Sequence, residues 1–151
     1  MIIGIDPALH NIGWCVITNE EKPQFIASGV ISIKTKSTQE RWENILTSFS
    51  EIIQKYEIEK AGIECPFVNS NPQTSLTLGV AKGLCMAKFI EHKIPISIFT
   101  PSHVKKIITG SGRAEKTQVQ YMVKQILNLT EDFKKLDESD AAGVAICCLM
   151  D

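Results

Sequence analysis

The chain has 151 residues, 44% hydrophobic and 22% charged, with a formal net charge of −1, which indicates one globular domain over residues 1–151 and excludes a disordered chain. No apolar run approaches the ~18 residues of a membrane span, and Asp6 interrupts the first apolar run, so we expect neither a membrane helix nor a signal peptide. The five cysteines are odd in number and contain no C-x-x-C pair, which argues against a disulfide framework or a zinc site and makes the cytosol the expected location.

The first third of the chain predicts strands. Met1–Asp6 and Gly13–Thr18 are apolar runs separated by turn-type residues, which indicates a hairpin, and Phe25–Ile33 is a third extended stretch. After these strands the apolar residues change from alternation to helical spacing. Ser37 followed by Glu40 predicts the start of an amphipathic helix that continues to about Tyr56.

Strands and helices alternate in the rest of the chain. The expected elements are a strand at Lys60–Glu64, a helix from Asn71-Pro72 to about His92, a strand at Ile94–Phe99, a short helix from Thr100-Pro101 to near Gly110, a helix around Val119–Leu127 and a last helix over Asp137–Met150. Small residues in the second of these helices predict its close packing against a sheet or another helix; they are Gly79, Ala81, Gly83 and Ala87. This order predicts an α/β fold in which a mixed sheet is flanked by helices, with right-handed crossovers between parallel strands.

Basic residues are concentrated in one segment. Residues 81–124 hold eight basic and two acidic residues, a net charge of +6, whereas the remainder holds eight basic and fifteen acidic residues, a net charge of −7. This asymmetry is typical of a polyanion-binding protein with a separate acidic cluster. Solvated lysines on helix faces explain the basic segment equally well.

Four acids stand out by their positions. Asp6 and Glu64 each end an apolar strand, and Asp137 and Asp140 share one face at the start of the last helix. Charges at such strand ends are costly unless they have a role, and converging carboxylates suit hard divalent cations that hydrolyse phosphodiesters. Each acid alone also has a structural explanation, as a turn residue, an ion-pair partner or a helix cap.

Taken together, the motifs resemble the RuvC family of Holliday-junction resolvases. The matching segments are Gly4-Ile5-Asp6-Pro7 with Gly13, Ile63-Glu64 with Phe67, Asn71 to Gly83, His103 to Lys106, Gly110 to Lys116 with Gln118 to Gln120, and Asp137 with Asp140-Ala141. They occur in the family's order and spacing over essentially the whole chain. Two departures are Ala8, where the family usually has glycine, and Pro66, which precedes the loop aromatic; they concern loop geometry and leave the acids intact.

The resemblance implies an RNase H-like fold, with a five-stranded mixed sheet flanked by helices on both faces. It implies a homodimeric endonuclease that uses two Mg²⁺ ions per site, with Mn²⁺ as a substitute, to nick symmetric strands of four-way junctions. It assigns metal binding to Asp6, Glu64, Asp137 and Asp140, with catalytic roles for these acids and for Lys116. It makes Lys105 and Lys116 phosphate contacts, Phe67 a wedge at the junction centre, and Arg113 and Lys82 further DNA contacts. A branch-migration motor is an implied partner.

Several alternatives stay open at this stage. Without the resemblance, Phe67 suits a core aromatic and Lys116 a surface lysine, although the helix dipole disfavours a cation in a first turn. A nuclease of the same fold acting on flaps or other branched DNA is the main functional alternative, followed by a junction-binding module that has lost cleavage. A sugar-kinase-like phosphotransferase lacks its second lobe here, and a P-loop at residues 110–117 is excluded because Glu115 replaces its second glycine. His10, His92 and His103 fit no metal-ligand spacing and are expected at the surface.

Overall fold

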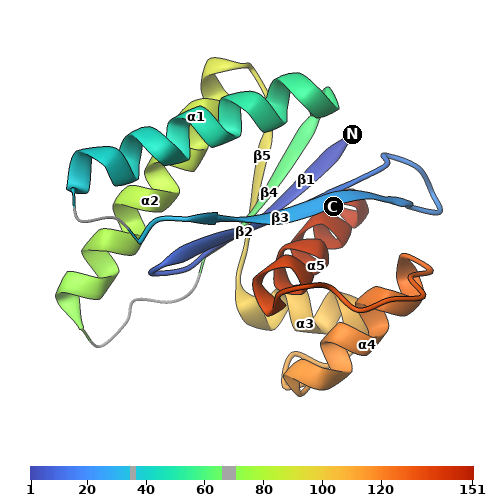
Figure 1. The fold of residues 1–151 in the computed structure, drawn as a ribbon. Helices are drawn as coiled ribbons and strands as arrows, with labels where there is room; N and C mark the ends of the chain where they lie inside the picture. Colours follow the sequence, from blue (N-terminus) through green and yellow to red (C-terminus); the bar gives the residue numbers. More distant parts are fainter. Residues whose placement is uncertain (35–36, 66–70) are drawn as a thin grey trace.

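The computed structural model describes residues 1–34, 37–65 and 71–151, and it places a five-stranded sheet between two groups of helices (Figure 1). The strands are β1 (Ile2–Pro7), β2 (Asn11–Ile17), β3 (Phe25–Ser32), β4 (Lys60–Glu64) and β5 (Ile96–Phe99). The helices are α1 (Thr38–Tyr56), α2 (Pro72–Glu91), α3 (Pro101–Thr109), α4 (Lys116–Ile126) and α5 (Leu136–Met150).

The sheet has the order β3-β2-β1-β4-β5 and mixes both kinds of pairing. The first three strands are antiparallel, whereas β1, β4 and β5 are parallel to one another. Helices α1 and α2 cover one face of the sheet, and α3, α4 and α5 cover the other (Figure 1). The predicted hairpin, the parallel strands and the mixed sheet with helices on both faces are therefore confirmed.

Helix starts follow from the capping residues that the sequence provides. The Ser37 hydroxyl accepts a hydrogen bond from the backbone N–H of Glu40 at 3.4 Å, and the Asn71 side chain accepts two from the first turn of α2. Thr100 caps α3 in the same way, and Gly110 ends that helix with a φ of 82°, a conformation that glycine adopts without strain.

The sheet separates two hydrophobic cores. Ile3 and Ile5 of β1 point toward α1 and α2, where Phe49 and Phe89 pack edge to face with ring centroids 5.6 Å apart. Ile2, on the opposite side of the same strand, belongs to the core that α3, α4 and α5 form. Alternation along β1 thus supplies apolar side chains to both cores, which explains why this strand is buried almost throughout.

Helix α5 lies directly on the sheet because glycines face it. A Cβ atom at Gly4 would lie 2.1 Å from the carbonyl oxygen of Ala141, and one at Gly13 would lie 2.1 Å from that of Asp137. No side chain fits into either gap. The sequence around Gly4 and Gly13 therefore determines how closely the start of α5 approaches β1 and β2.

One packing prediction is wrong for most of the residues it named. Ala81 is fully buried, but Gly79, Gly83 and Ala87 are exposed, and a Cβ atom at either glycine would meet nothing within 4 Å. Gly79, Gly83 and Ala87 therefore face away from the core, because the core-facing stripe of α2 is formed by Ala81, Cys85 and Phe89.

The minor residue predictions agree with the structure. All five cysteines are thiols rather than disulfides, and Cys147 and Cys148 are buried packing residues of α5. The three histidines are exposed at the surface. Within the described ranges, no helix combines the length and apolar character needed to cross a membrane.

Candidate active site

The sheet brings two of the four acids together at one edge. β1 and β4 are neighbouring parallel strands in which Ile5 pairs with Ile63, so the next residues, Asp6 and Glu64, emerge side by side where the strands end. Glu64 is also the last residue of β4. Parallel pairing thus converts two acids that are distant in sequence into neighbours.

The other two acids lie in the first turn of α5. Asp137 and Asp140 are three residues apart, which places them on one side of the helix. The close contact between Gly13 and the backbone of Asp137 holds this turn against β2, and the Asn11 amide donates a hydrogen bond to Asp137 Oδ2 at 3.4 Å. Each acid is partly buried in the structure.

Electrostatic interactions show that the four acids form one cluster. Burial, then the charges of Glu64, Asp140 and Asp137, raise the pKa of Asp6 from 3.8 to about 8. Burial and the charge of Asp140 likewise raise the pKa of Glu64, although a hydrogen bond shared with Asp6 acts in the opposite direction. The cluster therefore has an excess of negative charge that favours a proton or another cation.

Lys116 supplies part of the missing positive charge. Its Nζ lies 2.7 Å from Asp140 Oδ2, while its side chain remains 54% exposed to solvent. The hydrogen bond to Asp140 raises the pKa of Lys116, and the lysine charge lowers the pKa values of both Asp6 and Glu64. Lys116 is the first residue of α4, so the fold brings it to the acids despite the unfavourable helix dipole.

A cavity of about 170 Å³ opens beside these groups. Glu64, Asp140, Lys105 and Lys116 contribute polar groups to its wall. Its other lining residues are Pro101, Val104 and Val119. Two carboxylates and two ammonium groups around one small cavity suit a substrate that carries negative charge and that is recognised together with a cation.

The donor set of this cluster fits a hard divalent cation. Carboxylate oxygens are the ligands that Mg²⁺ and Mn²⁺ accept, and a dication relieves the repulsion that, together with the larger effect of burial, raises the pKa of Asp6. In the described part of the chain no three acid, cysteine or histidine side chains are already assembled as an ion cage. The oxygens are engaged instead in the Asp6–Glu64 hydrogen bond and the Lys116–Asp140 ion pair.

Lys82 and Arg113, the two further predicted DNA contacts, lie in different surroundings. The Lys82 ammonium donates to Cys65 Sγ at 2.7 Å, directly after Glu64, whereas Arg113 is exposed in the loop between α3 and α4. Phe67 and Pro66 lie outside the described residues. Ala8 does not have a positive φ. Alanine at the position where the family usually has glycine therefore causes no backbone strain.

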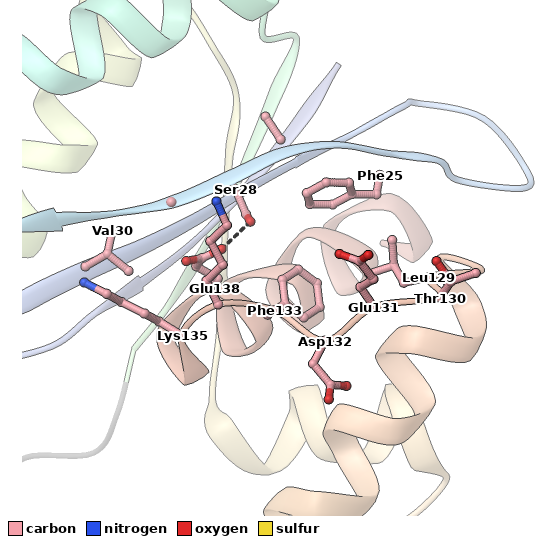
Figure 2. Close-up of a pocket in the computed structure, with 13 residues that line it drawn as sticks. Phe25, Ser28, Val30, Leu129, Thr130, Glu131, Asp132, Phe133, Lys135 and Glu138 are labelled. Carbon is pink, nitrogen blue, oxygen red and sulfur yellow. Dashed lines mark hydrogen bonds between the residues drawn. The ribbon is translucent and has the colours of Figure 1, made fainter.

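Sequence reasoning missed three residues around the first turn of α5. Asn11 contacts Asp137, and Glu138 accepts a hydrogen bond from Ser28 on the far side of the same turn. That side borders a cavity of about 730 Å³ between β3 and residues 129–135, shown in Figure 2. The sequence signal for Glu138 was its position next to Asp137. Its hydrogen-bond partner Ser28 could not be identified from the sequence, because it lies 110 positions away on β3.

Comparisons with known proteins give a consistent result. The family model "Crossover junction endodeoxyribonuclease RuvC" matches residues 2–148. A protein of that name from Rickettsia bellii is 38% identical over 152 residues, covering 99% of this chain and 97% of its own length. The structure titled "T. thermophilus RuvC in complex with Holliday junction substrate" is similar, with a TM-score of 0.90, 25% identity and coverage of 96% of this chain and 90% of its own. The yeast mitochondrial Holliday junction resolvase Ydc2 shares the fold, with a TM-score of 0.65, 16% identity and coverage of 98% and 78%.

Proposed function

The chain belongs to the RuvC family of crossover junction endodeoxyribonucleases, and from this premise we propose that it resolves four-way DNA junctions by nicking strands at symmetric positions. We take residues 1–151 as one nuclease domain. The observation that carries the proposal is the cluster of Asp6, Glu64, Asp137 and Asp140, in which burial and then mutual repulsion raise the pKa of Asp6 to about 8. A protein that only bound DNA would gain nothing from such charges beside phosphates.

Family members are metal-dependent nucleases, and we propose Mg²⁺, replaceable by Mn²⁺, as the cofactor. Asp6, Glu64, Asp137 and Asp140 would hold two ions, which would supply an activated water and stabilise the leaving oxygen of a phosphodiester. Cleavage then leaves 5′-phosphate and 3′-hydroxyl ends. Asp6 and Glu64 lie on rigid strand ends, so they position the reaction relative to the sheet.

The lysines beside the acids hold the DNA backbone. Lys105 and Lys116 line the same cavity as Glu64 and Asp140, where their ammonium groups meet a phosphate at the cleavage position. Lys116 exchanges its contact with Asp140 for the phosphate and stabilises the negative charge that develops there. Lys82 and Arg113 make further contacts with DNA, and Phe67 stacks at the junction centre.

A homodimer is supported by the outer face of α2. Leu76, Val80 and Ile90 are 65%, 40% and 64% exposed, and the exposed Gly79 and Gly83 lie on the same helix. An apolar face with small residues permits the close approach of a second helix. Two copies joined there present two active sites to the two symmetric strands. A branch-migration motor stays a prediction from the resemblance.

The deciding experiment is incubation with an end-labelled synthetic four-way junction and Mg²⁺, beside linear duplex and flap substrates of the same sequence. We expect paired nicks in the junction only. Asp6→Asn should abolish nicking and leave junction binding intact, whereas Asp132→Asn, at an exposed acid paired with Lys124, should cleave normally. Equal cleavage of the flap would reassign the substrate, and activity in Asp6→Asn would remove the acid cluster from the reaction.

A further inference from the structure

The first turn of α5 carries two of the proposed metal ligands, yet its own helix start is poorly capped. Lys135 occupies the N-cap position and makes no side-chain capping hydrogen bond. Leu136, the next residue, is 59% exposed. The position of Asp137 and Asp140 therefore depends on contacts that the turn makes with the sheet rather than on its own cap.

Glu138 makes such a contact on the flank opposite the acid cluster. Successive helix residues are about 100° apart, so Glu138 points roughly 160° away from Asp140. It is only 6% exposed, and its Oε2 accepts a hydrogen bond from the Ser28 hydroxyl at 2.5 Å. A hydroxyl–carboxylate bond of this length is charge-assisted and stronger than a neutral hydrogen bond.

The Ser28–Glu138 hydrogen bond connects β3 to the first turn of α5 across a gap in the packing. The cavity of about 730 Å³ separates β3 from residues 129–135, and Ser28 and Glu138 both line it (Figure 2). Side-chain packing is therefore incomplete on this flank of the turn. In Figure 2 the dashed line between Ser28 and Glu138 crosses directly from the strand to the helix.

We propose that the Ser28–Glu138 pair is a positioning device for the metal site, which fixes the rotation of the first turn of α5 and thereby the placement of Asp137 and Asp140. This inference rests on the proposed function. A rotation of the turn by about 20° moves a carboxylate at a radius of ~5 Å by roughly 2 Å. Mg²⁺ requires near-octahedral ligands at about 2.0–2.1 Å, so such a rotation weakens metal binding before it unfolds the protein.

The test measures metal binding directly, by titration calorimetry of the DNA-free protein with Mn²⁺. Ser28→Ala should weaken Mn²⁺ binding by roughly tenfold or more, as for other residues that orient metal ligands. Ser28→Thr, which retains the hydroxyl, should bind Mn²⁺ with the wild-type affinity. Should Ser28→Ala not fold, Glu138→Gln replaces it and should also weaken binding, because the neutral amide accepts a weaker bond.

A matched control lies at the other end of the same helix. The Lys60 ammonium donates to the carbonyl oxygen of Cys148 at 2.7 Å, so Lys60→Met removes an anchor of α5 that is remote from the acids. It should lower the melting temperature without changing Mn²⁺ affinity. Unchanged affinity in Ser28→Ala, or an equal loss in Lys60→Met, overturns the proposal. Wild-type protein that binds no Mn²⁺ overturns the proposed metal site as well.

Discussion

Asp6→Asn should change the pH dependence of stability in the metal-free protein. The pKa of Asp6 is 3.8 in the unfolded chain and about 8 in the folded one, so the folded state binds the extra proton between these values. Stability from this group is complete below pH 3.8 and is lost as pH rises toward 8. At 1.36 kcal/mol per pH unit, wild-type protein loses on the order of 4 kcal/mol between pH 5 and pH 8 from this source.

The measurement is urea unfolding in EDTA at several pH values, followed by the fluorescence of Trp14 and Trp42. Asparagine does not titrate, so the stability difference between Asp6→Asn and wild type should grow with pH by on the order of 4 kcal/mol over that range. Asp132→Asn should follow the wild-type curve, and Mg²⁺ should stabilise wild type far more than Asp6→Asn at pH 8. Parallel curves of stability against pH for wild type and Asp6→Asn would refute the inference that the pKa of Asp6 is raised in the folded protein.

Three further changes test the site. Lys116→Ala should lower the single-turnover nicking rate by about 100-fold and affect junction affinity much less; equal losses would make Lys116 a docking contact only. Gly13→Ala places a Cβ atom 2.1 Å from the Asp137 carbonyl, so its free energy of unfolding in urea should fall by about 3 kcal/mol, and unchanged stability would contradict the close approach of α5. Phe67→Ala should slow cleavage of an intact four-way junction more than that of a pre-nicked one, and equal slowing of both would argue against a wedge.

The fold was predictable because local signals agreed with the tertiary arrangement. Strand and helix periods change where the structure changes, and Ser37, Asn71 and Thr100 cap the helices that the sequence assigns to them. Asp6 and Glu64 could be selected because a charge at the end of an apolar strand needs a reason. The resemblance of the motifs then implied the RNase H-like fold.

The missed features all depend on contacts between distant segments. Nothing local in Ser28 indicates that it meets Glu138 across 110 positions. The outward direction of Gly79 and Gly83 could not be read from α2 either, because small residues suit a covered face regardless of which neighbour covers it.

Because α5 packs directly on the sheet, the packing of the hydrophobic core also determines the position of the acids at the start of this helix. Near the far end of the helix, a Cβ atom at Gly62 would lie 2.9 Å from Cys148 Cβ. Almost every residue from Glu138 to Cys148 is buried. A larger side chain where α5 contacts the sheet therefore displaces the whole helix, including the first turn that carries Asp137 and Asp140. A larger side chain at Gly62, far from the acids, should therefore lower the cleavage rate as well as the free energy of unfolding.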